Sequence, residues 1–466
     1  MRLQLFAKRT VAALVVRSKI QIQLQGAHIM SYASKLKKSL FQCIKTLNQN
    51  RSEYCHAPGR DYTRNRKADF SSIIKAVLCF GGKSLNKELY EIFGFSPDTL
   101  TPSAFIQQRS KIKPEAFEEL FRSFNRANQQ IQLFHGYRLL AIDGSLLHTP
   151  TNKMDTDSLH YNRTSCFNLY NVNALYDLNS HTYTDVLIQK FKQRNEHSAF
   201  VKLVDDLDSS VPALITADRG YESYNNLAHV QESGHKFLIR MKDKNSNGIL
   251  QRFKLSDGEF DLPIHLTLTR KQTNDLKSDP SVICIGNSRK LDFLPYSYKK
   301  TDPTVFYSLD FRIVRVKISD DCYEILATNL DEREFPPSLL KEIYAMRWGI
   351  ETSFRKLKYT VGLTALHSKK SEHILQEIFA RLIMYNFSEL VTSHIAIRKK
   401  KRKHLYRINF SIAVHACRNL LLGRYAPKNV EAVIGKNILP IRPNQSNPRP
   451  KHRRIIPLNC FTYRIA

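Results

Sequence analysis

Four residues of the segment YAMRWGIETSFRKLK have side chains and spacings that suit work on phosphate groups. Tyr344, Arg347, Glu351 and Lys358 follow one another at intervals of three, four and seven residues. In a regular α-helix, at about 100° per residue, they fall within an arc of roughly 60° on one face. A carboxylate among cations suits a site in which the acid binds a metal ion and the cations bind phosphate groups. The alternative is an exposed helix stabilised by salt bridges between successive turns.

Two further acids end or interrupt apolar runs that predict buried strands. Asp143 lies in RLLAIDGSLL, and Asp218 lies in ALITADRGY. A charged side chain in such a setting is costly unless it is paired or bound to a metal. The alternative for each aspartate is that it caps a turn at the end of a strand. Together with Glu351, the two aspartates favour one metal site over separate structural roles.

The elements around these acids predict the fold class. Three runs, RLLAIDGSLL, CFNLYNVNALYDL and TYTDVLIQKF, predict an antiparallel meander. Helical patterns in NEHSAFVKLVDDL and YNNLAHVQES then alternate with strands over ALITADRGY and HKFLIRMK. Three antiparallel strands followed by β-α-β-α-β form a ribonuclease-H-like α/β fold, with a mixed five-stranded sheet and flanking helices. In that fold Asp143 lies in the middle of the first strand and Asp218 just beyond the fourth, so the two are neighbours.

The motifs resemble those of the DDE transposases of bacterial insertion sequences, in particular insertion-sequence family four. The resemblance covers roughly residues 60–400 and depends on the pattern Tyr-x2-Arg-x3-Glu-x6-Lys with the IDG and DRGY aspartates. It implies that Asp143, Asp218 and Glu351 are the catalytic, metal-binding residues. The expected contacts to the DNA of the transposon end are made by Tyr344, Arg347, Lys358, Arg219, Trp348 and Arg355.

The chemistry of such an enzyme explains these residue types. Cutting a phosphodiester requires a deprotonated nucleophile, first water and later a 3′-hydroxyl, and charge relief on the leaving oxygen. Two Mg²⁺ ions about 3.5–4 Å apart serve both needs, and carboxylates are their preferred ligands; Mn²⁺ is an expected substitute. Arg347 would bind phosphate oxygens through two parallel hydrogen bonds, and Lys358 would bind them as a point charge. Tyr344 also suits the covalent tyrosine of a recombinase, but its neighbours favour a backbone contact.

A long segment separates Asp218 from Glu351 and predicts a β-rich insertion domain at residues 243–335. Its β-like runs are FDLPIHLTLTR, SVICIGNSRKLDFL, FRIVRVKI and CYEILATNL, separated by Asp, Gly, Asn and Pro. The ribonuclease-H-like core would then consist of two parts, residues 136–242 and 336–397.

The two ends of the chain carry the remaining domain predictions. Residues 30–135 predict a helical domain, with Ser and Pro at several helix starts. The resemblance implies that this domain binds the terminal inverted repeats of the element; the alternative is a helical cap on the core. Residues 398–466 begin with six consecutive basic residues, which suit a solvated segment or a non-specific grip on DNA. We hypothesise that translation starts at Met30 and that residues 1–29 are a non-native extension.

Composition agrees with a nucleic-acid partner. The chain has 72 Lys and Arg against 42 Asp and Glu, a net charge of +30. Such an excess attracts double-stranded DNA, although ribosomal or membrane-surface binding would need a similar charge. No apolar stretch approaches the roughly 20 residues of a membrane span, and the eight cysteines form no CxxC pair. We therefore expect a cytoplasmic protein with no membrane partner, no disulfide framework and no zinc site, and the resemblance implies a bacterial, nucleoid-associated one.

The sequence thus predicts a transposase that binds the inverted repeats of its insertion sequence. It would cleave the ends by two-metal-ion hydrolysis and join the 3′-hydroxyl ends to target DNA. The resemblance also implies a homodimer in the synaptic complex. The alternatives are a domesticated, non-catalytic DNA-binding protein and a related nuclease without strand transfer. Glu196, His197 and His148 suit either supporting groups around the site or ordinary helix-start and loop residues.

Overall fold

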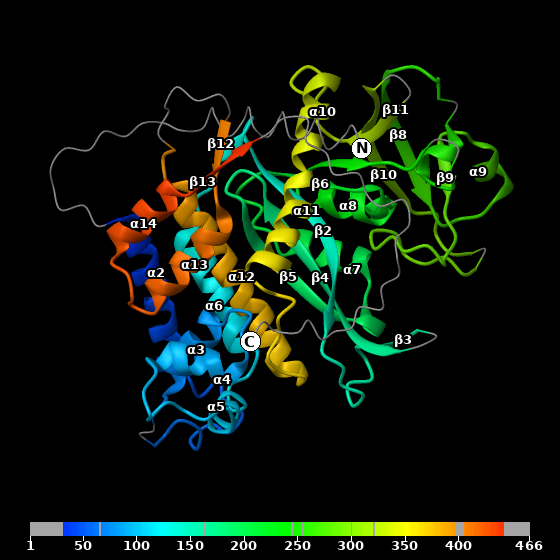
Figure 1. The fold of residues 1–466 in the computed structure, drawn as a ribbon. Helices are drawn as coiled ribbons and strands as arrows, with labels where there is room; N and C mark the ends of the chain where they lie inside the picture. Colours follow the sequence, from blue (N-terminus) through cyan, green and yellow to red (C-terminus); the bar gives the residue numbers. More distant parts are fainter. Residues whose placement is uncertain are drawn as a thin grey trace.

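The computed structural model describes most of the chain between residues 31 and 441 (Figure 1). The described ranges are 31–64, 67–162, 165–243, 246–253, 255–299, 301–319, 322–397 and 405–441. The predictions for residues 1–29 and for a start at Met30 lie outside these ranges. So do the basic run that follows residue 397 and the tail beyond residue 441.

Five strands form the centre of a large mixed sheet. They are β2 (Tyr137–Thr149), β4 (Cys166–Asp177), β5 (Thr182–Lys190), β6 (Ala213–Ala217) and β7 (Lys236–Arg240). β4 is antiparallel to both β2 and β5, whereas β6 runs parallel to β2 and β7 runs parallel to β6. The order β5-β4-β2-β6-β7 is the topology that the sequence predicted. Two short strands, β1 (Leu133–Phe134) and β3 (Leu159–Tyr161), pair with β2 and β4.

The strands of the long middle segment belong to this same sheet. They are β8 (Phe260–Thr269), β9 (Val282–Cys284), β10 (Phe306–Ser319) and β11 (Cys322–Thr328), and the short helix α9 (Asn274–Ser278) precedes β9. β11 pairs with β7 in the register Leu326↔Arg240, so the sheet continues through β11, β10, β8 and β9 to a total of 11 described strands. The prediction of a five-stranded sheet is therefore too small. The outer edge of β7 would expose unpaired backbone N–H and C=O groups, and pairing with β11 satisfies them. Of the run SVICIGNSRKLDFL only Val282–Cys284 is a strand.

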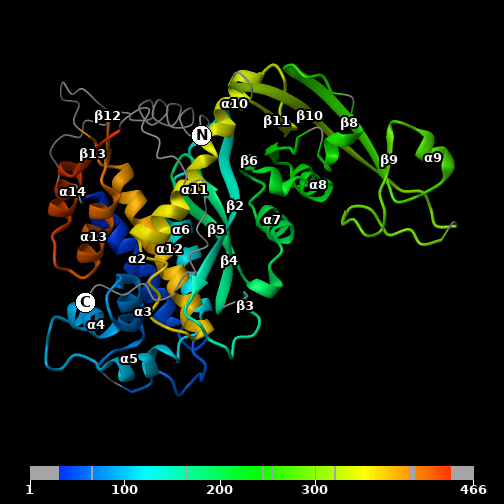
Figure 2. The ribbon, with the colours of Figure 1, turned by 45° about the vertical axis from the view of Figure 1, so that its right-hand side comes forward.

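Helices cover both faces of the sheet (Figure 2). One face carries α7 (Glu196–Asp205) and α8 (Tyr224–Glu232), and the other carries α10 (Pro337–Met346), α11 (Trp348–Arg355) and α12 (Ser371–Ser393). Successive residues of a strand point to opposite faces. Accordingly, Leu139 and Ala141 of β2 belong to the core beneath α12, whereas Leu140 and Ile142 belong to the core beneath α7 and α8.

A helical body packs on the outer side of α12. It comprises α2 (Tyr32–Gln49), α3 (Phe70–Cys79), α4 (Leu85–Phe93), α5 (Pro102–Arg109), α6 (Glu115–Asn128), α13 (Phe410–Leu421) and α14 (Pro427–Lys436). A two-stranded antiparallel sheet of β12 (Leu405–Ile408) and β13 (Ile438–Ile441) flanks it. Side chains cap several starts, as the sequence predicted: Asp69 accepts a hydrogen bond from Ser72 N, and Thr101 precedes Pro102. α12 is buried on most sides because the sheet and this body cover it.

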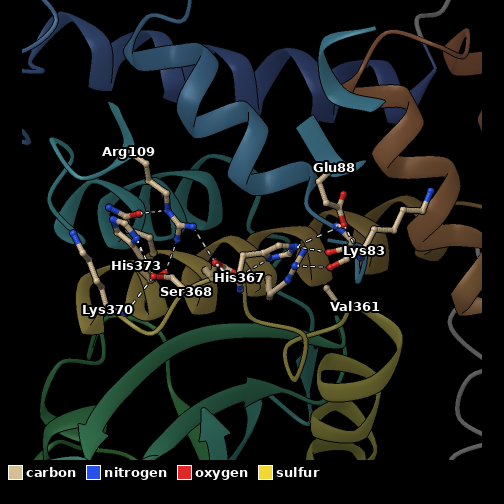
Figure 3. A network of polar contacts seen from close by, with 12 residues as sticks. Lys83, Glu88, Arg109, Val361, His367, Ser368, Lys370 and His373 are labelled. Atoms are coloured by element: carbon tan, nitrogen blue, oxygen red, sulfur yellow. Dashed lines mark hydrogen bonds and ion pairs between the residues drawn. The ribbon is translucent and has the colours of Figure 1, made fainter. Parts of the chain in front are cut away.

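A buried polar network fastens the helical body to α12 (Figure 3). Arg109 of α5 donates from Nε to Gln376 Oε1 at 2.7 Å and from its terminal nitrogens to Glu377 Oε1 at 2.9 Å and the His373 carbonyl at 2.6 Å. His367 is 3.0 Å from the second oxygen of Glu377. Because the charges are paired at full burial, α5 and the helices packed with it are anchored to the sheet through α12. In the described part of the chain, no helix is long and apolar enough to cross a membrane.

Candidate active site

Asp143 and Asp218 lie where β2 continues beyond the end of the neighbouring strand β6. β2 pairs with β6 only as far as Ala141↔Thr216, and β6 ends at Ala217. Asp143 is therefore mid-strand, opposite Ala174 of β4, next to the turn that Asp218 begins. Asp143 Oδ1 accepts from Gly144 N at 2.9 Å, and Asp218 Oδ1 accepts from Gly220 N at 2.7 Å. Asp218 thus does cap a turn, the alternative considered above, and its second carboxylate oxygen has no part in that cap.

Glu351 comes from the opposite side, on α11. Arg347 separates α10 from α11, and its guanidinium donates to Glu351 Oε1 at 3.0 Å. Lys358 lies on a π-helical turn, η4 (Lys356–Thr360), and donates from Nζ to the Leu146 carbonyl at 2.7 Å. The prediction of one regular helix through all four residues is wrong, because the chain breaks at Arg347 and widens to i→i+5 bonding after Arg355. Such π-turns occur often at functional sites.

Asp218 and Glu351 act electrostatically on Asp143. Burial raises the pKa of Asp143 to about 7; Arg347 opposes this shift, whereas Asp218 and Glu351 add to it. A carboxylate perturbed in this way needs compensation by a positive charge. Carboxylate oxygens suit a hard divalent cation, which would offset the burial and the repulsion that raise this pKa. Within the described ranges, however, no three acidic, histidine or cysteine side chains are grouped closely enough to hold a metal ion.

Tyr344 and Arg347 lie beneath this centre rather than on the surface. Tyr344 is 2% exposed and Arg347 is 3% exposed. Burial raises the pKa of Tyr344 to about 12. Within the described structure the Tyr344 hydroxyl and Arg347 Nε have no hydrogen-bond partner. The Arg347 guanidinium is 5.5 Å from the Tyr344 ring and 5.2 Å from the Trp348 ring. A buried phenol with a raised pKa is poorly suited to act as a nucleophile.

The other predicted DNA contacts are more accessible. Arg219 and Arg355 are exposed, and Trp348 and Lys358 are half-buried. Burial lowers the pKa of Lys358. Arg219 directly follows Asp218, and Arg355 lies one turn beyond Glu351 on α11. The structure thus brings cationic side chains to the borders of the acidic centre.

Several polar residues near this centre were not predicted. Asn171 and Asn173 of β4 are buried beside β2, and Tyr221 follows Asp218 in the DRGY turn. The signal in the sequence was the pair of asparagines two positions apart, Asn171 and Asn173, in a largely apolar strand. His148 is less informative: burial lowers its pKa, and its ring lies 5.0 Å from that of Phe167.

The structure has a large mixed sheet flanked by helices. Acids from β2, the end of β6 and α11 lie near one another on this sheet. These two features define the class of protein. The family described as "Transposase DDE domain" matches residues 134–387, the stretch from β1 to α12. The chain belongs to this family of DDE transposases.

Known proteins of the same kind are similar to this chain. The transposase InsG for the insertion sequence element IS4 of Escherichia coli (strain K12) is 25% identical over 306 residues, which is 62% of this chain. The chain spans 60% of the length of that relative. Among solved structures, the piggyBac transposase in a synaptic complex with hairpin DNA has a TM-score of 0.46 at 10% identity, with 87% of this chain and 86% of that chain covered.

Proposed function

We propose that this protein is a transposase that cleaves the DNA ends of its own insertion sequence and joins their 3′-hydroxyl groups to target DNA. The observation that carries the proposal is that three acids from separate elements lie near one another: Asp143 on β2, Asp218 just beyond β6 and Glu351 on α11, and the last two raise the pKa of the first. Membership of the DDE transposase family supports it. So does the net charge of +30, since a polyanion is the natural partner of so basic a chain.

In this proposal the three carboxylates hold two divalent cations, Mg²⁺ by preference and Mn²⁺ as a substitute. The bound ions would supply activation of the attacking oxygen and charge relief on the leaving oxygen. Because the described carboxylates are not grouped closely enough to hold an ion, they would approach one another when cations and DNA bind. Arg347 would hold Glu351 in the orientation needed for this approach through their 3.0 Å hydrogen bond.

The DNA would lie over the cationic borders of the acidic centre. Lys358 and Arg355 follow Glu351, and Arg219 follows Asp218, so phosphates on both sides of the cut would meet a positive charge. Tyr344 would act from beneath by packing against Arg347. The helices of residues 30–135 would bind the inverted repeats, and two copies of the chain would hold two ends in the synaptic complex. The middle segment, 243–335, would act as the insertion domain of the family.

Purified protein incubated with a duplex carrying the element's end and Mg²⁺ tests the proposal. We expect nicking at the end, transfer of the 3′-hydroxyl strand to a second duplex, and loss of both with Asp218→Asn or with a chelator. Asp275→Asn, on the remote helix α9, is the matched control and should retain activity. Nicking without transfer would favour the nuclease, and specific binding without nicking would favour the non-catalytic DNA-binding protein. Equal nicking by Asp218→Asn and the parent would refute the assignment of the acids.

A further inference from the structure

A polar cavity of about 620 Å³ lies between the starts of α7 and α8 and the segments that follow β7 and β9. This volume is in the range of ordinary ligand sites. Three cations and one acid line the cavity, and most of its other lining side chains are amides and hydroxyls. The cations are Lys242, Arg289 and Lys290. The acid, Glu222, accepts hydrogen bonds from the backbone N–H groups of Lys242 and Ile249, so its charge is already used within the protein.

The cavity and Asp218 lie at the same edge of the sheet. β6 and β7 are parallel neighbours, with Ala217 paired to Ile239, so their carboxyl ends lie side by side. Asp218 directly follows β6, and Lys242 follows β7 by two residues. From Asp218 the chain passes through the turn η2 (Arg219–Tyr221) into α8, whose first residues line the cavity. Ligands of α/β proteins commonly bind beyond the carboxyl ends of parallel strands, and this cavity has that position next to the acidic centre.

The positive groups of the cavity are only partly compensated by the protein. Within the described ranges, the side chains of Lys242 and Arg289 make no hydrogen bond or ion pair. Lys290 instead pairs with Asp292 at 3.1 Å. Ser223 precedes α8, and its side chain makes no capping hydrogen bond. Uncompensated cations attract an anion, and the positive end of the α8 dipole adds to their effect. The cavity therefore suits a phosphate group.

Buried hydrogen bonds fix the loop 286–294, which carries two of the lining cations. Arg270, which is 3% exposed, donates four hydrogen bonds of 3.0–3.1 Å to carbonyl oxygens of this loop. Asp292 attaches the loop to α8, because its carboxylate lies 3.0 Å from His229 Nε2 and its backbone N–H donates to Asn225 Oδ1 at 2.8 Å. A fixed loop loses little conformational entropy when it binds a ligand. The loop thus presents its cations to the cavity in one arrangement.

We propose that this cavity binds phosphates of the DNA strand next to the cut, with Lys242, Arg289 and Lys290 as the contacts. This inference rests on the proposed function and adds to it a phosphate-binding surface on the α7 and α8 side of the sheet edge. Contacts of this kind fix the position of a strand without reading its sequence. The ordinary alternative is a hydrated hollow with solvated cations. That alternative does not explain why a fixed loop brings two cations to the same hollow as Lys242.

Equilibrium binding in the presence of a chelator tests the inference without cleavage. The full chain is titrated with a duplex carrying the element's end and its flanking DNA at several salt concentrations. Each lost phosphate contact should lower the slope of log affinity against log salt by about 1. We therefore expect a decrease of about 1 for Lys242→Gln and of about 3 for the triple variant Lys242→Gln, Arg289→Gln, Lys290→Gln. Lys277→Gln removes an exposed cation of α9 outside the cavity and should leave the slope unchanged.

Neutral phosphate analogues locate the contacts on the DNA. Methylphosphonate linkages placed one at a time beside the cut should weaken binding by the parent at particular positions. The same linkages should have no further effect on the triple variant, because both changes remove the same contact. Binding of inorganic phosphate alone that the triple variant loses, without any methylphosphonate effect, would assign the cavity to a free phosphate ion and overturn its assignment to DNA.

The same titrations separate failure of this inference from failure of the proposed function. If the triple variant keeps the slope and the methylphosphonate profile of the parent, while the parent still prefers the element's end to a random duplex, the cavity is refuted and the proposed function stands. Equal affinity of the parent for the two duplexes would instead refute the proposed recognition of the ends, and the slopes of the variants would still decide the role of the cavity.

Discussion

The side chain of Arg347, which is only 4% exposed, donates a hydrogen bond of 3.0 Å to the half-buried Glu351 carboxylate one helical turn away. This hydrogen bond connects Arg347, which lies at the break between α10 and α11, to the acidic centre. Arg347 also lies against the rings of Tyr344 and Trp348. A buried cation in this position controls both the charge near Asp143 and the direction of Glu351. Its removal should therefore affect chemistry as well as folding.

Arg347→Ala should abolish or strongly reduce end cleavage. It should also lower the free energy of unfolding by about 1–3 kcal/mol, because the Glu351 carboxylate loses its hydrogen-bond donor and the rings of Tyr344 and Trp348 lose a buried neighbour. Urea unfolding followed by circular dichroism gives the stability, and nicking of a labelled duplex gives the rate. Arg355→Ala removes an exposed arginine from the same helix and should change stability by less than about 0.5 kcal/mol. Equal stability losses for the two variants would contradict the role of Arg347.

Gly144→Ala should impair the centre through crowding. The added methyl group would lie 3.1 Å from Asn173 Oδ1 and 3.4 Å from Glu196 Oε1, tighter than an ordinary contact. Overpacking of this kind costs about 1–3 kcal/mol, and a displaced Asp143 would slow cleavage. Gly258→Ala meets no atom within 4 Å and is the matched control. Unchanged cleavage by Gly144→Ala would mean that this strand tolerates side chains beside Asp143.

The network around Glu377 should dominate the attachment of the helical body. Arg109 and Glu377 are 2% and 1% exposed, and loss of Arg109 removes the main positive partner of the buried Glu377 carboxylate. Arg109→Met should lower the free energy of unfolding by about 3–5 kcal/mol. Arg126→Met, which breaks an exposed pair with Glu119, should cost less than about 1 kcal/mol. Thermal or urea unfolding of both variants measures the difference, and similar values for the two would be evidence against the network.

Asp155 should make stability depend on pH in the acid range. Burial alone would raise the pKa of Asp155, but hydrogen bonds with Lys190, Ser371 and Tyr170 outweigh it and lower the value from 3.8 to about 2. Because the folded pKa is depressed, the stabilisation is complete above about pH 4 and is lost as the pH falls toward 2. The free energy of unfolding of Asp155→Asn should therefore decline less steeply between those values than that of the parent. Parallel pH profiles for the two proteins would contradict the assignment.

The sequence predicted those parts of the fold that depend on local patterns. Apolar runs around Asp143 and Asp218 identified β2 and β6, and helical periodicity identified α7, α8 and α12. Their order was sufficient for the ribonuclease-H-like topology, because the connections between consecutive strands leave few arrangements.

Long-range contacts could not be predicted in this way. Pairing of β11 with β7 joins Leu326 to Arg240, and nothing local to either strand specifies that partner. No proline marks the break at Arg347. The π-turn after Arg355 does not alter the helical pattern of apolar and polar residues, so neither feature can be predicted from the local sequence. The approach of Glu196 to Gly144 likewise depends on how α7 packs on the sheet. The predicted roles of the DNA-contacting residues remain predictions.

The pairing of β11 with β7 has a mechanical consequence. Backbone hydrogen bonds run unbroken from β4 through β2, β6 and β7 to β11, β10 and β8, so the outer strands cannot swing about a linker relative to Asp218. The outer strands and the acidic centre therefore belong to one continuous sheet, and any displacement of β11 is transmitted to β7 and β6 through backbone hydrogen bonds.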